Sequence, residues 1–137
     1  MHAVIEMHDS ECLAIELNEK GGGFVLLKAY IHRGEGDPLM SPHEGGTQRI
    51  RVKAEGMTLE GVVGDLPAWI YEGSLTVGAD VQDNIVRFPA IYADSFRLSM
   101  MLADDARVVV VSGKGLSIEP ESEFEFVETV DFSSRER

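Results

Sequence analysis

Apolar and polar residues alternate with a period of two along much of this chain, and this alternation limits the folds open to it. In the segment 95–102, SFRLSMML, the even-numbered positions are all apolar and most of the odd ones are polar. The segments 47–54, TQRIRVKA, and 122–128, SEFEFVE, repeat the pattern. Such alternation is typical of β-strands with one face buried. Nearly continuous apolar runs at 24–31 and 107–111 indicate strands covered on both faces.

Short segments rich in Gly, Asn and Asp separate these runs. We predict turns at 18–23, 55–56, 78–84 and 103–106, so strands recur every 8 to 12 residues or so. No stretch has the amphipathic pattern of a substantial helix. We therefore predict the all-β class: a single-domain antiparallel β-sandwich or β-barrel of roughly nine or ten short strands with little helix. The domain should span residues 1–132, and we expect a disordered tail at 133–137.

Length, charge and cysteine content narrow the class of protein. A chain of 137 residues is long enough for one domain with its own core and too short for two ordinary ones. The formal charge of −12 disfavours binding to nucleic acid or to anionic membranes. It would attract basic partners or cations, but we favour the simpler interpretation that it keeps the protein soluble. Cys12 is the only cysteine, and we find no secretory signal and no membrane-spanning apolar run. We expect a cytoplasmic protein.

The stretch 107–119, RVVVVSGKGLSIE, contains a Gly-Lys pair that raises the question of a phosphate-binding loop. Such a loop requires G-x-x-x-x-G-K-[ST] followed by a helix. Here Val108 stands five positions before Gly113, Gly115 follows Lys114, and another strand pattern comes next. We therefore predict no phosphate-binding site, and we interpret SGKG as a tight hairpin turn.

Histidines and carboxylates suggest a metal site only weakly. Residues 8–12 contain His, Asp, Glu and Cys, and His32, His43 and Glu44 flank or lie in a glycine- and proline-rich segment at 33–46. These side chains suit Zn²⁺ or Fe²⁺. The spacing lacks H-E-x-x-H and C-x-x-C, so solvated loop and strand-end residues are the competing interpretation. We predict no cofactor, and we keep a divalent metal at His32, His43 and Glu44 as the alternative.

A basic row and a pair of aromatic residues are candidate binding features. Arg49, Arg51 and Lys53 share one face of a strand and could bind an anionic ligand or partner. The competing interpretation is cross-strand pairing with Glu123 and Glu125, if the two strands are adjacent. A second candidate, the pair Trp69 and Tyr71, could anchor a partner or a saccharide, although residues at this period usually belong to the core.

The C-terminal stretch 115–132 has six acidic residues and no Lys or Arg. Glu123 and Glu125 in this stretch are candidates for binding a basic partner protein, while protection of a sheet edge is the structural alternative. We favour a non-catalytic interaction or small-regulator module, which could also self-associate. Two alternatives stay open. One is a small-molecule- or metal-binding barrel, cupin-like or lipocalin-like in shape only, with the loop 33–46 as its lid. The other is an enzyme whose site is assembled from dispersed residues.

Overall fold

The computed structural model describes residues 1–103 and 107–131, and in this part of the chain it contains nine strands and no helix. The predicted all-β class is confirmed. The expected tail at 133–137 and most of the predicted turn at 103–106 lie outside the described residues. The strands are β1 (His2–Leu17), β2 (Gly23–Gly34), β3 (His43–Gly61), β4 (Ala68–Val77), β5 (Asp80–Asp83), β6 (Ile85–Arg87), β7 (Ala90–Leu102), β8 (Arg107–Pro120) and β9 (Glu125–Val130).

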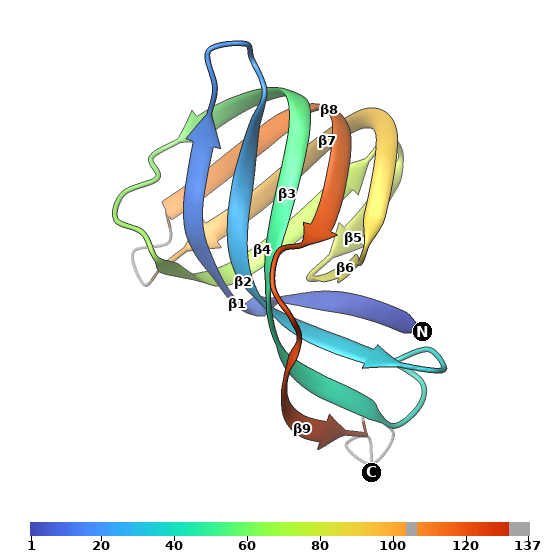
Figure 1. The fold of residues 1–137 in the computed structure, drawn as a ribbon. Helices are drawn as coiled ribbons and strands as arrows, with labels where there is room; N and C mark the ends of the chain where they lie inside the picture. Colours follow the sequence, from blue (N-terminus) through green and yellow to red (C-terminus); the bar gives the residue numbers. More distant parts are fainter. Residues whose placement is uncertain (104–106, 132–137) are drawn as a thin grey trace.

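Six strands form a closed antiparallel barrel in the order β1-β2-β3-β8-β7-β4 (Figure 1). The barrel closes where β4 returns to β1, with Trp69 opposite Glu11 and Ala68 opposite Cys12. Closure pairs each barrel strand on both sides, so the barrel itself presents few open edges. The three remaining strands extend this framework: β5 pairs with β4, β6 with β1 and β9 with β3.

The barrel interior is filled by the inward-facing residues of each strand. Ile50 on β3 is fully buried, as the alternation predicts, and so are Val109 and Val111 on β8. The expectation that the runs 24–31 and 107–111 are covered on both faces is wrong, because Lys28 and Val108 are exposed. The remaining internal void measures about 10 Å³ and is lined only by Ile, Met, Leu and Val side chains. A void of this size is at the lower limit for a single water molecule. This void is too small to hold a metabolite.

Strands β3 and β8 bend together at two glycines that we expected to form turns. Gly56 is the Cα partner of Lys114, and Gly113 is the partner of Met57. A Cβ atom on Gly113 would overlap the carbonyl oxygen of Gly56, so the close approach of the two backbones requires glycine there. The predicted turns at 55–56 and at SGKG are therefore wrong, because both segments lie within continuous strands.

Beyond the barrel, three strands continue into a small projecting sheet that we call the tongue (Figure 1). It consists of residues 2–6 of β1, 30–34 of β2, 43–48 of β3, and β9. Here β9 pairs with the outer side of β3, while β6, which is not part of the tongue, pairs with residues 4–6 on the outer side of β1. The tongue therefore carries β9 at one edge, away from the closed barrel.

A bulge in β1 marks the junction of barrel and tongue. Between Glu6 and Glu11 the register shifts, and residues 7–10 lie opposite Ala29 alone. The buried Ser10 hydroxyl donates a hydrogen bond to the Glu6 carbonyl (2.8 Å) and accepts one from the Tyr30 amide (3.0 Å). This hydroxyl thereby replaces ladder hydrogen bonds that the bulge interrupts.

The connection between β2 and β3 is shorter than the predicted irregular segment 33–46, because the two strands extend to Gly34 and begin again at His43. Inside it, the Asp37 carbonyl accepts hydrogen bonds from the Met40 and Ser41 amides (3.0 and 3.1 Å), so the loop contains one compact turn. It lies at the far end of the tongue from the barrel. The lid role of this loop stays a prediction.

Candidate functional site

Residues just before β9 in the chain attach it to the tongue. The Arg49 carbonyl accepts a hydrogen bond from the Glu121 amide (2.8 Å), and the Ser122 hydroxyl accepts one from the Arg49 amide (2.9 Å). β9 then pairs with β3 from Thr47 to His43. A Cβ atom on Gly46 would overlap the Glu125 carbonyl oxygen and lie 2.6 Å from the Phe124 ring. Glycine at position 46 is therefore what allows β9 to lie against β3.

Apolar side chains of β9 face solvent on its outer part. Phe126 is 57% exposed and Val127 is 54% exposed. The register shift between Gly45 and Gly46 inserts Val127 as an extra residue, so these two neighbours are exposed together. The edge of β9 that faces away from β3 pairs with no strand in residues 1–103 and 107–131. β9 thus presents backbone groups and apolar side chains at the same edge.

The acidic residues of this region divide into paired and unpaired groups. Glu119 and Glu121 are neutralised by the basic row, whereas Glu123 and Glu125 form no ion pair within the described ranges. Glu128 lies near the Tyr30 hydroxyl, and burial together with this carboxylate raises the pKa of Tyr30 to about 12. Arg33 lies over the Phe124 ring at 3.7 Å, but its ion-pair partner is Glu44 at 3.6 Å, so the carboxylates of Glu123 and Glu125 keep β9 negative.

Two members of the basic row, Arg51 and Lys53, form cross-strand ion pairs, but with partners other than those predicted. Lys53 contacts Glu119 (2.9 Å) and Arg51 contacts Glu121 (2.6 Å), because β8 is the strand beside β3 here. The Arg51 guanidinium also stacks over the Phe24 ring at 4.0 Å. Hydrogen bonds from these cations lower the pKa values of both glutamates. The expected pairing with Glu123 and Glu125 is therefore wrong.

Trp69 and Tyr71 lie on the outer surface of β4. Their side chains are 60% and 62% exposed, while Ile70 between them is buried. Residues at their spacing usually belong to the core, but the register shift between Ile70 and Glu72 changes the alternation, and both side chains point outward. Their exposure keeps them available as contact residues, yet they lie on the barrel, apart from β9.

The predicted metal residues are only partly brought together. His32 Nδ1 lies 2.7 Å from His43 Nε2, and His32 Nε2 lies 2.7 Å from Glu6 Oε1. The Ser41 carbonyl accepts a hydrogen bond from His43 Nδ1 (2.9 Å). Glu44 instead faces Arg33 at 3.6 Å. Each nitrogen of both buried rings has a hydrogen-bonding neighbour, which a metal ion would have to displace. A metal site at His32, His43 and Glu44 stays a prediction.

A different set of donors is close enough to hold a metal ion. Ligand atoms of Glu6, His8 and Asp9 all lie within 4.8 Å of one another at the β1 bulge. The hydrogen bond from His32 is the main cause of the lowered pKa of Glu6, while burial and the neighbouring Glu6 carboxylate raise the pKa of Asp9. His8 and Asp9 were among the residues considered from the sequence. Glu6 was missed, because strand alternation alone does not bring positions 6 and 9 to one side.

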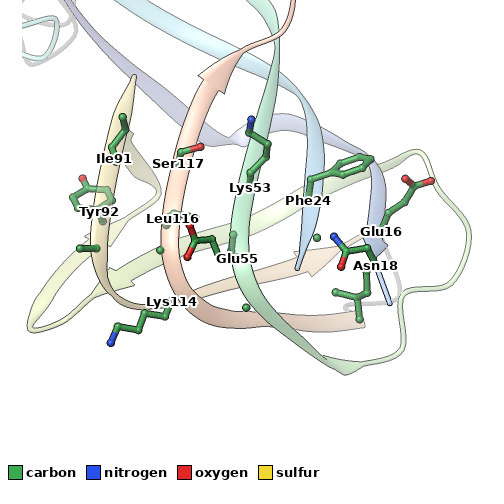
Figure 2. Close-up of a pocket in the computed structure, with 16 residues that line it drawn as sticks. Glu16, Asn18, Phe24, Lys53, Glu55, Ile91, Tyr92, Lys114, Leu116 and Ser117 are labelled. Atoms are coloured by element: carbon green, nitrogen blue, oxygen red, sulfur yellow. The ribbon is translucent and has the colours of Figure 1, made fainter. Parts of the chain in front are cut away.

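An open groove of about 1000 Å³ lies on the barrel (Figure 2). Strands β8, β3 and β2 form its floor, with Ile91 of β7 at one rim and Glu16 of β1 at the other. Lys53 and Lys114 line it together with Glu16 and Glu55. Because charges of both signs line the groove, it favours neither an anionic nor a cationic ligand, in contrast to β9.

Cys12 is not a reactive group in this fold. Its side chain is fully buried, and burial raises its pKa to about 11. We expect native protein at pH 8 to react with Ellman's reagent at least about a hundredfold more slowly than guanidinium-unfolded protein, since only the thiolate reacts. The absorbance of the released thiol measures both rates. Equal rates in the two states would show that the barrel opens readily at Cys12.

No protein-family model matches the chain, and no curated protein or solved structure is significantly similar to it. Within the described ranges, the structure has no helix of the length and apolar character needed to cross a bilayer.

Proposed function

We propose that this protein is a non-catalytic interaction module that binds a basic, extended segment of a partner protein along β9. One observation carries the proposal: within the described residues, β9 combines an unpaired edge, two adjacent exposed apolar side chains and glutamates without ion-pair partners. An extended segment that adds to such an edge gains main-chain hydrogen bonds, and its side chains determine specificity.

Edge protection is the main competing explanation for the acidic residues. Natural sheets protect open edges with charges, prolines or very short strands. Glu125 and Glu128 fit that description, but Phe126 and Val127 do not, because exposed apolar residues make an edge more adhesive. The charges then act as a filter that rejects acidic segments and admits basic ones.

A second copy of the chain is a less favourable occupant of this edge. Pairing of two β9 strands would bring two negatively charged segments, each with Glu125 and Glu128, side by side. Like charges opposite each other on paired strands are destabilising. A segment with Lys or Arg at alternate positions would place cations there instead, and we therefore infer a basic partner.

The proposal is tested with a fluorescent peptide that alternates lysine with valine, titrated with the full chain and followed by anisotropy. Binding should weaken as NaCl rises from about 0.01 to 0.15 M, because the Debye length falls from roughly 30 to 8 Å. The double variant Glu123→Lys, Glu125→Lys should bind at least about tenfold more weakly, since it opposes like charges. A peptide alternating glutamate with valine should not bind.

The matched control is the double variant Glu19→Lys, Glu60→Lys. Both residues are exposed and lie far from β9, and each pair of replacements adds four charges, taking the formal charge from −12 to −8. The control should retain nearly all of the affinity. Equal weakening in the two double variants would mean that only net charge matters, and the assignment of the site to β9 would be wrong.

A further inference from the structure

The bulge in β1 gathers three metal-binding side chains on one side of the strand. In a regular strand the side chains at positions 6 and 8 share a face and that at position 9 points away. The extra residues opposite Ala29 change this, and ligand atoms of Glu6, His8 and Asp9 come within 4.8 Å of one another. Bulges commonly redirect side chains in this way beside functional sites.

The separations between these donor atoms suit a bound ion. His8 Nε2 lies 3.5 Å from Asp9 Oδ1 and 3.9 Å from Glu6 Oε2. Two ligands at zinc distances of about 2.0–2.2 Å in tetrahedral geometry lie roughly 3.3–3.6 Å apart. A small movement of the exposed His8 and Asp9 side chains would therefore complete the geometry, while Glu6 stays in place.

Independent support for the site comes from a residue outside the three donors, His32, which holds one carboxylate oxygen of Glu6. His32 is 2% exposed, and its Nε2 lies 2.7 Å from Glu6 Oε1, while Oε2 lies on the His8 side. His32 is in turn held by His43 at 2.7 Å. Carboxylates that ligate metals are typically oriented by such outer-shell hydrogen bonds. The buried histidine pair thus fixes one carboxylate and leaves its second oxygen toward the other two donors.

The charge balance of this cluster favours a cation. The carboxylates of Glu6 and Asp9 are crowded together, and their only ion-pair neighbours within the described ranges are His8 and His32. No Lys or Arg in this part of the chain pairs with them. An ion between the two carboxylates would relieve their mutual repulsion.

We propose that Glu6, His8 and Asp9 form a binding site for a divalent transition-metal ion of the Zn²⁺ and Co²⁺ class. The imidazole nitrogen distinguishes this donor set from the all-oxygen sites that Mg²⁺ and Ca²⁺ prefer. His8 and Asp9 are about half exposed, so the ion would keep coordination positions open to water or to a further ligand. This site is separate from β9 and stands whether or not β9 binds a partner.

The test is calorimetric titration of the chelator-treated full chain with Co²⁺ and, separately, with Zn²⁺. We expect one ion per chain, and we expect His8→Ala and Asp9→Asn each to weaken binding by at least about tenfold, as loss of a ligand should cost no less than loss of an outer-shell partner. Both residues are exposed, so neither variant should unfold the protein. The metal-free variants should melt at the same temperature as the metal-free unaltered protein, which would verify that they are folded.

The matched control is His2→Ala, which removes an exposed histidine from the same strand. It should bind both ions as the unaltered protein does. In the NMR spectrum, Co²⁺ should shift or broaden the ring signals of His8 and leave those of His2 unaffected. The proposal is overturned if His8→Ala binds Co²⁺ and Zn²⁺ with full affinity, if His2→Ala is impaired equally, or if neither ion binds. Mg²⁺ binding as tight as that of Zn²⁺ would also contradict it.

Discussion

Replacement of Gly46 by alanine is expected to release β9 from the tongue while the barrel stays folded. The added Cβ would overlap the backbone oxygen of Glu125 and lie 2.6 Å from the Phe124 ring, so β9 must move away. Overpacking of this kind costs about 1–3 kcal/mol, which corresponds to roughly 5- to 150-fold more frequent opening. Amide hydrogen exchange across β9 should accelerate by that factor, whereas exchange in β8 should not change.

Gly56→Ala is the matched control for this experiment, because it lies on the same strand and its added Cβ would meet no atom within 4 Å. Its exchange rates should match those of the unaltered protein. The Gly46 variant should also lose affinity for the lysine-valine peptide, because the β9 edge is no longer presented. If amide exchange across β9 is as slow in Gly46→Ala as in the unaltered protein, the packing of β9 on β3 is loose enough to accommodate the added Cβ.

The second large effect is expected in the barrel interior, at Leu27→Ala. Leu27 is 1% exposed and borders the small internal void. Loss of its side chain removes buried apolar surface and enlarges that void, which typically costs 2–5 kcal/mol. For a domain of this size the melting temperature should fall by roughly 5–20 °C. Urea unfolding followed by tryptophan fluorescence measures the free energy.

Leu26→Ala provides the comparison for Leu27→Ala. Leu26 is the preceding residue, it lies on the other face of β2, and it is only half-buried. Because the same side chain is removed from the outer surface, the free energy of unfolding should fall by a much smaller amount. Similar losses at the two positions would contradict the assignment of inner and outer faces along β2.

The sequence predicted the class of fold because alternation reports directly which residues face the core. Phe96, Leu98 and Met100 are buried as their spacing indicates. Alternation did not distinguish a turn from a bend, and Gly56 and Gly113 were misassigned for that reason. Glycine permits both a change of chain direction and a close backbone approach, and only the pairing of β3 with β8 decides between them.

The candidate sites were harder to predict because bulges and strand order determine them. The register shift in β4 exposes Trp69 and Tyr71. The register shift in β1 brings the side chain of Asp9 close to that of Glu6. A bulge leaves no clear signal in hydrophobic periodicity, because it changes the phase of the pattern without changing its composition. The partners of Arg51 and Lys53 depend on which strand lies beside β3, and sequence distance alone does not show this.

The most direct test of the proposed function is an NMR titration of the isotope-labelled full chain with the lysine-valine peptide. Binding along β9 predicts that the amide signals of residues 125–130 shift first and become protected from exchange, while those of the groove around Phe24 and Ile91 stay unchanged. Shifts confined to the groove, or to Trp69 and Tyr71, would contradict the assignment of the docking edge to β9. An unchanged spectrum at a saturating peptide concentration would contradict the interaction itself.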